Sequence, residues 1–472
     1  MKKVRFIPLG GSNEVGANSY FIDFIEQNFS VLLDCGNMGD VFIESDPEYH
    51  YVLPNKVDAI IITHAHNDHI GSIPKAIRFL LKENGKIYMT EQTAEITAPI
   101  LEDIYKINSK YFSEYEKQIY DPNKTKKILE NYIYKLKYED TYKIHPEINL
   151  TLFNANHVYG SSMVLIKTPD FSVLYTGDFN DKETFLNDPL DFNKLKHITG
   201  KLDILITEST YILKEKDFNK ENILRLISSF INNAKRNHGR VLFPSFALGR
   251  TQEILAAIKM AKERKIIDQD ISISVSSGLA NKITRIYLEN KEFKEKLNIP
   301  FSVNNGDKRT DVIIATSGFI AKNTLSYQYF EDMINENKSY AIFPSEYAYQ
   351  KFKNTNRIQG KLNINYVELS AHTDKTGIKK LINTLEPSFT ILVHGENGYK
   401  FIKEIENDKS SNILVPEYNG EEFIFIRNSE EHIRLIRSSS CISYVITCGK
   451  SAANKEFNDI ETAKRSSAEL NT

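Results

Sequence analysis

The fold of this chain is decided by one stretch of its sequence, Ile60-Ile61-Ile62-Thr63-His64-Ala65-His66-Asn67-Asp68-His69-Ile70-Gly71. A short β-branched run that meets turn-forming residues predicts a buried strand, which ends near Thr63. Three imidazoles and one carboxylate follow on the loop, and this set suits zinc. So short a loop divides its ligands more easily between two ions than it points them at one. The expected pairs are His64 with His66 and Asp68 with His69.

Further candidate ligands lie beyond this loop, at the ends of other predicted strands. His157 lies between two apolar runs, and Asp178 follows another. Together they offer a third imidazole for one ion and a carboxylate that can bridge two ions roughly 4 Å apart. His372 and His394 each end a further predicted strand, and the residues alone do not tell their roles apart. Asp34, also at a strand end, is expected to orient a ligand imidazole.

The composition is that of a soluble globular protein with more than one domain. The chain has 472 residues, 41% of them hydrophobic, and 60 basic and 62 acidic residues give a formal net charge of −2. A polyanionic substrate would therefore need a local basic groove or the metal ions. The N-terminus lacks the apolar core of a signal peptide, no apolar run reaches membrane-span length, and three cysteines offer no disulfide framework. We expect a cytoplasmic protein without a membrane partner.

The order of the predicted elements indicates an α/β fold in which one domain is inserted into another. Strands dominate residues 1–211, strands and helices alternate over residues 212–366, and short strands resume over residues 367–428. The alternation is typical of a parallel sheet with ligand-binding loops at its strand ends. We expect residues 212–366 to form the inserted domain, and we predict no structure for the tail, residues 429–472.

One segment of the first domain has two interpretations. After a predicted helix over 72–84 and a strand over 86–90, residues 93–138 combine lysine and tyrosine in a mostly helical pattern. Basic residues with interleaved aromatics can hold phosphates and stack bases. A helical hairpin that packs its tyrosines on the body and solvates its lysines explains the same composition, and we favour this interpretation.

Several short motifs of the chain occur together in one known family. They are His64–His69, His157 with Gly160-Ser161, Gly177-Asp178, Glu208–Tyr211, Pro244–Arg250, Ser370–Asp374 and Val393–Glu396. The set resembles the β-CASP branch of metallo-β-lactamase-fold nucleases, with features of both cleavage-and-polyadenylation-factor-like RNases and RNase J. The resemblance covers roughly residues 1–428. It implies a metallo-β-lactamase αββα sandwich with an inserted α/β cap domain. Pro344–Gln350 departs from the family pattern, because the relatives commonly have a Gly-rich, Arg-ended loop there.

Carried over residue by residue, the resemblance implies two zinc ions per chain. A bridging hydroxide would attack the scissile phosphorus, since zinc lowers the pKa of bound water to roughly 7. His372, oriented by Glu208, would protonate the leaving oxygen. Manganese could occupy the same ligands. The implied ligands are His64, His66 and His157 for one ion, Asp68, His69 and His394 for the other, and Asp178 as the bridge, with Asp68 also counted as catalytic.

The resulting hypothesis is a two-zinc ribonuclease that cleaves single-stranded RNA by endonucleolytic or 5′-exonucleolytic attack. A homodimer is one assembly that we consider. Ser245, Arg250 and Ser317 lie on cap loops that could hold a substrate phosphate, while an ion pair between domains would explain Arg250 equally well. The alternatives are a DNA nuclease of the same fold, a non-catalytic RNA-binding subunit of a processing complex and a small-molecule hydrolase. His394 favours RNA, because DNA-directed relatives often lack a histidine there.

Overall fold

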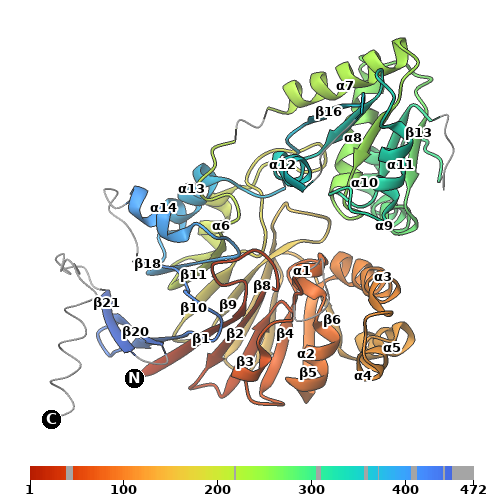
Figure 1. Ribbon diagram of the computed structural model, residues 1–472. Coiled ribbons are helices and arrows are strands. Elements are labelled where there is room, and N and C mark those ends of the chain that lie inside the picture. Colours follow the sequence, from red (N-terminus) through yellow and green to blue (C-terminus); the bar gives the residue numbers. More distant parts are fainter. Residues whose placement is uncertain are drawn as a thin grey trace.

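The protein is described by a computed structural model, which covers residues 1–38, 46–216, 219–303, 310–355, 360–369, 371–405, 412–439 and 442–448. Figure 1 shows a body built on two facing β-sheets and a separate lobe above it. The first sheet has the order β21-β20-β19-β1-β2-β3-β4-β5-β6. Its strands are β1 (Lys2–Gly10), β2 (Ser19–Phe24), β3 (Phe29–Leu33), β4 (Val57–Ile61), β5 (Leu81–Thr90), β6 (Ile133–Leu136), β19 (Glu422–Arg427), β20 (Ile433–Ser439) and β21 (Ile442–Cys448).

The second sheet of the body has the order β18-β17-β11-β10-β9-β8-β7. Apolar side chains from both sheets, among them Phe6, Ile22, Val164 and Ile206, form one buried cluster between them. Burial of this inner face supplies the main driving force for pairing the two sheets. The strands are β7 (Thr141–His145), β8 (Ile148–Asn154), β9 (Ser162–Lys167), β10 (Ser172–Tyr175), β11 (Ile204–Glu208), β17 (Phe389–Val393) and β18 (Asn412–Leu414).

Helices cover the outer faces of the two sheets and complete an αββα sandwich. Those on the first sheet are α1 (Asn67–Ile70), α2 (Ile73–Phe79), α3 (Glu91–Asn108), α4 (Glu114–Ile119) and α5 (Pro122–Tyr132), preceded by a 3₁₀ turn at Tyr49–Tyr51. Those on the second are α6 (Phe192–Thr199), α13 (Lys375–Leu385) and α14 (Gly398–Ile405). The architecture is the α/β sandwich that the sequence predicts.

The upper lobe, here called the cap, is a five-stranded parallel sheet of order β13-β14-β12-β15-β16 with helices on both faces. Its strands are β12 (Val241–Pro244), β13 (Ile273–Ser276), β14 (Val312–Ala315), β15 (Tyr340–Phe343) and β16 (Asn363–Tyr366). Its helices are α7 (Lys220–Arg236), α8 (Arg250–Glu263), α9 (Gly278–Glu289), α10 (Lys291–Leu297), α11 (Leu325–Met333) and α12 (Glu346–Thr355). The predicted boundaries at residues 211, 366 and 428 stay predictions.

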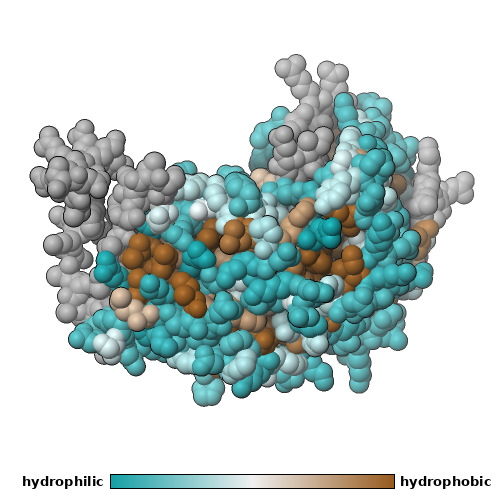
Figure 2. Space-filling view, turned by 90° about the horizontal axis from the view of Figure 1, so that it is seen from below, coloured by the Kyte–Doolittle hydropathy of each residue, from teal (hydrophilic) through white to brown (hydrophobic). Residues whose placement is uncertain are grey.

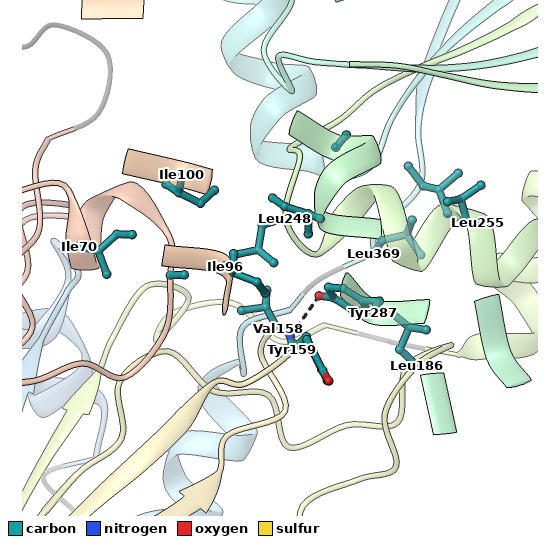
Figure 3. Close-up of a cluster of buried hydrophobic side chains, with 14 of the residues drawn as sticks. Ile70, Ile96, Ile100, Val158, Tyr159, Leu186, Leu248, Leu255, Tyr287 and Leu369 are labelled. Carbon is teal, nitrogen blue, oxygen red and sulfur yellow. Dashed lines mark hydrogen bonds between the residues drawn. The ribbon is translucent and has the colours of Figure 1, made fainter. Parts of the chain in front are cut away.

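The cap is packed onto the body through a continuous apolar core. Figure 3 shows Leu248 and Tyr287 of the cap against Val158 and Tyr159 of the body, and all four belong to one buried cluster. The Tyr159 backbone N–H donates to the Tyr287 hydroxyl at 3.1 Å. At Gly249, which has φ = 89°, an added Cβ would lie 2.7 Å from Val158 Cγ1. Only glycine fits this crossing point, because it combines the left-handed conformation with the close approach.

The structure differs from the sequence prediction at two places. The helix predicted over residues 72–84 ends at Phe79, and β5 begins at Leu81 rather than at Lys86. Leu81 pairs with Val57 on β4 and is 4% exposed, so pairing and burial determine where the strand begins. In the tail, β20 and β21 extend the first sheet beyond β19, where the sequence predicts no structure. Residues 449–472 of that tail lie outside the described residues.

The lysine- and tyrosine-rich segment forms α3, α4 and α5, as the hairpin interpretation expects in outline. Its tyrosines divide between the two predicted environments, since Tyr120 is 2% exposed whereas Tyr111 and Tyr115 are exposed. Seen from below, the molecule is mostly hydrophilic, with hydrophobic residues gathered in separate patches (Figure 2). Within the described part of the chain, no helix has the length and apolar character needed to span a bilayer.

Candidate metal centre

The candidate ligands meet at one end of the sandwich because they all follow strands that end there. β10, β11 and β17 run parallel, so Asp178, Glu208 and His394 emerge at the same edge of the second sheet. Thr63 and the His64–His69 loop follow β4 of the facing sheet. The carboxyl ends of parallel strands are the usual place for a functional site in an α/β fold.

Asp178 faces two separate groups of imidazoles with its two oxygens. Its Oδ2 lies 3.7 Å from His64 Nε2 and 3.6 Å from His157 Nε2, and both of these nitrogens belong to the group that contains His66. Both nitrogens also lie 3.1 Å from His66 Nδ1. Three imidazole nitrogens and a carboxylate oxygen therefore converge on one point, which is the donor set of a zinc site.

The other oxygen of Asp178 faces the second group. Asp178 Oδ1 lies 3.4 Å from His69 Nε2 and 3.1 Å from His394 Nδ1. Asp68 Oδ2 lies 3.4 Å from His394 Nε2 and 3.8 Å from His69 Nε2. In each group, the ligand atoms lie within 4.8 Å of one another. The structure thus brings together all seven ligand candidates; their role as ligands stays a prediction.

The unpaired atoms of the site fit a pair of cations. Asp178 Oδ1 and His394 Nε2 are buried and make no hydrogen bond to the described residues. A buried polar atom without a partner costs about 1–3 kcal/mol, and a charged one costs more. Imidazole nitrogens and carboxylate oxygens at these positions are ligands that zinc accepts. The residues present therefore fit two zinc ions.

The pKa shifts of the site also indicate that it is built for positive charge. Burial lowers the pKa of His64 and of His157 well below the ordinary value. Burial opposes charge on His394 as well, but the nearby carboxylates of Asp178 and Asp68 outweigh it and raise its pKa to about 10. The pKa of His69 is raised for the same reason, chiefly by the carboxylates of Asp178 and Asp34, which outweigh the effect of burial. Excess negative charge therefore attracts protons wherever a cation does not balance it.

Hydrogen bonds behind the ligands fix which imidazole nitrogen faces the site. Asp34 Oδ2 lies 2.8 Å from His69 Nδ1, as expected for a residue that orients a ligand. The carbonyl oxygen of Ala371 lies 2.8 Å from His157 Nδ1, which leaves Nε2 free for the site. The Leu248 carbonyl of the cap lies 3.4 Å from His66 Nε2. Partners of this kind hold a ligand in one tautomer and orientation.

His372 and Glu208 form a pair beside the ligand groups. His372 Nδ1 lies 2.8 Å from Glu208 Oε2, and its Nε2 lies 3.8 Å from Asp178 Oδ2. Glu208 is held by the Phe179 backbone N–H, which donates to Oε1, and by the Thr210 hydroxyl, which donates to Oε2. These two residues could also join Asp178 and His394 in a third metal-binding group. Their contact with each other already occupies one nitrogen and one oxygen, which favours a proton-transfer pair.

The three candidates for phosphate binding have different surroundings. Ser245 is fully buried, and its hydroxyl contacts the Phe246 carbonyl and the Thr251 hydroxyl at 3.2 Å, so it is engaged within its own loop. Ser317 Oγ is buried without a hydrogen-bond partner among the described residues. Arg250 is partly exposed, and its side chain makes no hydrogen bond or ion pair within the described ranges. The interdomain ion pair considered for Arg250 is therefore absent there.

Sequence reasoning missed several residues that support the site. Tyr175 donates from its hydroxyl to Asp34 Oδ2 at 2.9 Å, and Asn18 Nδ2 lies 3.0 Å from His69 Nε2. The Tyr211 ring lies edge-on to the His372 ring, with centroids 5.7 Å apart. Tyr211 stands next to Thr210 in the Glu208–Tyr211 motif, which was the one signal available for it. Ser370 of the Ser370–Asp374 motif lies outside the described residues.

Comparison with known proteins adds family and fold. A family model described as a metallo-beta-lactamase superfamily domain matches residues 24–212, and one described as a Zn-dependent metallo-hydrolase RNA specificity domain matches residues 357–416. The chain is 28% identical to Integrator complex subunit 11 of Danio rerio over 91% of its own length and 75% of that protein. It is 27% identical to cleavage and polyadenylation specificity factor 73 of Drosophila melanogaster, over 86% of its length and 63% of that protein.

A solved structure agrees on the fold. The crystal structure of a protein of unknown function from Enterococcus faecalis V583 is similar over 90% of this chain and 100% of that chain, with a TM-score of 0.57 and 14% sequence identity. This likeness bears on the fold alone. The family matches, the sandwich, the cap and the histidine-rich centre together lead to one assignment. Residues 24–212 belong to the metallo-β-lactamase superfamily, and the chain as a whole is related to the β-CASP nucleases within that superfamily.

Proposed function

We propose that this chain is a two-zinc ribonuclease that hydrolyses phosphodiester bonds of single-stranded RNA. The observation that carries the proposal is the position of Asp178, whose two oxygens face two groups of imidazoles beside His372 and Glu208. The names of the relatives and the description of the RNA specificity domain at residues 357–416 support RNA as the substrate. Single-stranded DNA is the alternative substrate.

The proposed metal ligands are the residues of the two groups. When bound, zinc would supply Lewis acidity to a phosphate oxygen and to the attacking water. The chain holds the donors in place, because His64, His69 and Asp178 are each at most 3% exposed and are fixed from behind. Such burial excludes bulk water and strengthens every electrostatic contact in the site. The proposed ligands are His64, His66 and His157 for one ion, Asp68, His69 and His394 for the other, and Asp178 between them.

His372 is the proposed general acid. Its Nδ1 is held by Glu208, so Nε2 is the nitrogen that faces the reaction. A proton on Nε2 can pass to the oxygen that leaves phosphorus, and histidine is suited to this near neutral pH. Glu208 acts through His372 by contacting Nδ1 and fixing the orientation of the ring. Arg250 and Ser317 are the proposed phosphate contacts, whereas Ser245 is expected to support the loop that carries Arg250.

The test uses one single-stranded sequence as 5′-monophosphorylated RNA and as DNA, labelled at both ends. Zinc content is measured on the same preparation. RNA cleavage with close to two zinc ions per chain is the expected result, and the product sizes distinguish endonucleolytic from exonucleolytic attack. The matched variants are Asp178→Asn, expected to lose zinc and activity, and Asp203→Asn, a buried carboxylate at the opposite end of β11 that is expected to keep both. Cleavage of DNA alone, or RNA binding without cleavage by fully loaded protein, would overturn the proposal.

A further inference from the structure

Three aromatic rings form a ladder on the face of the cap where its parallel strands end. Phe246 and Phe319 lie on the loops that follow β12 and β14, and Tyr347 lies in the first turn of α12, which follows β15. The Phe246 and Phe319 centroids lie 5.2 Å apart, and those of Phe319 and Tyr347 lie 6.2 Å apart. Gly318 backs the ladder, since an added Cβ there would lie 3.1 Å from the Phe246 ring.

This aromatic ladder is open to solvent although it is apolar. Phe246 is 41% exposed and Tyr347 is 53% exposed, while Phe319 between them is partly buried against the cap core. Large apolar side chains that gather in the open, rather than singly, usually mark a binding surface. The ladder therefore has the character of a binding surface.

The ladder lies beside the metal centre. Phe246 is two residues from Leu248, whose carbonyl oxygen lies 3.4 Å from His66 Nε2. On the other side, Glu346 precedes Tyr347 and pairs with Lys214 at 3.3 Å, and the Lys214 ammonium lies 5.4 Å from the centre of the Tyr211 ring that contacts His372. Figure 1 shows α12, which carries Tyr347, at the end of the cap that faces the body. A strand whose phosphate reaches the metals can therefore place neighbouring bases on the ladder.

The charge around the ladder suits a polyanionic strand. The Lys351 ammonium lies 4.4 Å from the centre of the Phe319 ring. Lys216 lies 3.3 Å from the centre of the Tyr211 ring and pairs with Glu368 at 3.2 Å. Lys214 and Arg250 add two further cations beside Tyr211, where the neighbouring carboxylates are those of Glu208, Glu346 and Glu368. Cations interleaved with aromatic rings are the common way to hold single-stranded nucleic acid.

We propose that Phe246, Phe319 and Tyr347 form a stacking site for unpaired nucleobases next to the metal centre, an inference that rests on the proposed nuclease function. Every base has a π-face, so such a site is tolerant of sequence and selects for single strands, because paired bases in a duplex already stack on their neighbours. Stacking of this kind engages the face of the base and does not read the sugar. The ladder therefore accepts RNA and DNA strands alike, and discrimination between them is made elsewhere.

The test measures binding of short phosphorothioate-linked single strands, which resist hydrolysis, to the full-length zinc-loaded chain. One strand carries 2-aminopurine among its bases, and a second has the same number of linkages but abasic sites throughout. Because the chain contains no tryptophan, 2-aminopurine emission can be followed without interference from that residue. Phe319→Leu and Tyr347→Leu remove a ring each and keep apolar volume. Tyr347→Phe keeps the ring, and Phe79→Leu removes an exposed ring from α2, which is outside the proposed site.

The wild-type protein should quench 2-aminopurine and bind the base-bearing strand more tightly than the abasic one. Each leucine variant should weaken binding of the base-bearing strand about five- to hundredfold, reduce quenching and leave abasic binding unchanged. Tyr347→Phe and Phe79→Leu should behave as wild type. Equal losses for both strands, or no loss for either, would overturn the stacking site. Cleavage assays on the same variants separate the two proposals. If the protein cleaves RNA but its binding does not depend on bases, only the stacking proposal fails. If binding depends on bases but no strand is cleaved, only the nuclease proposal fails.

Discussion

His372 Nδ1 lies 2.8 Å from Glu208 Oε2, and this contact turns the Nε2 of the same ring toward Asp178 Oδ2 at 3.8 Å. The pair therefore presents the Nε2 nitrogen of His372 to the ligand groups. Neither residue is needed to complete the two groups that Asp178 joins. This arrangement separates the proposed proton donor from the proposed metal ligands and makes the two roles separately testable.

The first prediction concerns His372→Ala. The variant should keep the zinc content of the wild type, because neither group of proposed ligands loses a member, and should lose about 10²–10⁴-fold in cleavage rate. A substrate with sulfur in place of the leaving oxygen needs little help from a proton, so the variant should cleave it at close to the wild-type rate. An equal loss on both substrates would show that His372 does not act as the acid.

The second prediction concerns Asp34→Asn. Asp34 accepts hydrogen bonds from the Thr63 backbone, the Thr63 hydroxyl and Tyr175, and it contacts His69 Nδ1. The backbone of Asp34 has φ = 58°, a conformation that asparagine tolerates. The substitution therefore acts mainly on the hydrogen-bond donors around the side chain, some of which would then face an amide NH₂ group instead of a carboxylate oxygen. Zinc affinity or activity should fall about 10–100-fold, as chelator competition and cleavage rates would show. Unchanged zinc affinity would mean that Asp34 does not orient His69.

The ligand loop, the strand-end carboxylates and the α/β class could be predicted from the sequence because they depend on local order, whereas the αββα layering was implied by the family resemblance. An apolar run that ends in His64 or Asp178 places that side chain at a sheet edge whatever lies around it. The contact between Tyr175 and Asp34 joins residues 141 positions apart, and no local pattern encodes it. The same holds for Leu81, whose strand assignment depends on pairing with β4. Ser245 looked available on a loop, but the packing of the cap buries it.

The third prediction concerns removal of metal. Zinc bound to the folded chain but not to the unfolded one stabilises each site by about 2.7 kcal/mol when free zinc is at a hundred times Kd. A chelator should therefore lower the thermal midpoint, and zinc should restore it. The shift should be smaller in Asp178→Asn, which has lost the residue that joins the groups, and unchanged in Asp203→Asn. A midpoint that does not respond to chelation would contradict a metal site in this fold.

The fourth prediction concerns Lys216. Burial lowers its pKa to about 8, against the opposing effect of Glu368 at 3.2 Å. Because an unfolded lysine has a pKa of roughly 10.4, the charge on Lys216 opposes folding below about pH 8, and this opposition fades as the pH rises toward the unfolded value. NMR of ¹³C-methylated lysines should show one resonance that titrates near pH 8 and that is lost in Lys216→Gln. Glu368→Gln should move it lower, and a bound polyanion should move it higher.

The fifth prediction concerns the joint between cap and body at Tyr287. Its buried hydroxyl accepts a hydrogen bond from the Tyr159 backbone N–H at 3.1 Å. Tyr287→Phe leaves this buried donor unpaired and should therefore destabilise the protein by about 1–3 kcal/mol.

The control is Tyr142, whose hydroxyl accepts a hydrogen bond from the Lys137 backbone N–H at 3.0 Å in an exposed setting, where water replaces the lost hydroxyl. Tyr142→Phe should therefore change stability by less than about 0.5 kcal/mol in the same urea titration. Both variants remove a bond from a backbone N–H to a tyrosine hydroxyl, and Tyr142→Phe also removes the exposed bond that its hydroxyl donates to Asp140, so a larger loss at Tyr287 reflects burial. If the two variants lost stability equally, the cap would not be held by a dry interface. If the prediction holds and Tyr287→Phe also cleaves more slowly with full zinc content, docking of the cap positions the loop that carries Leu248 against His66.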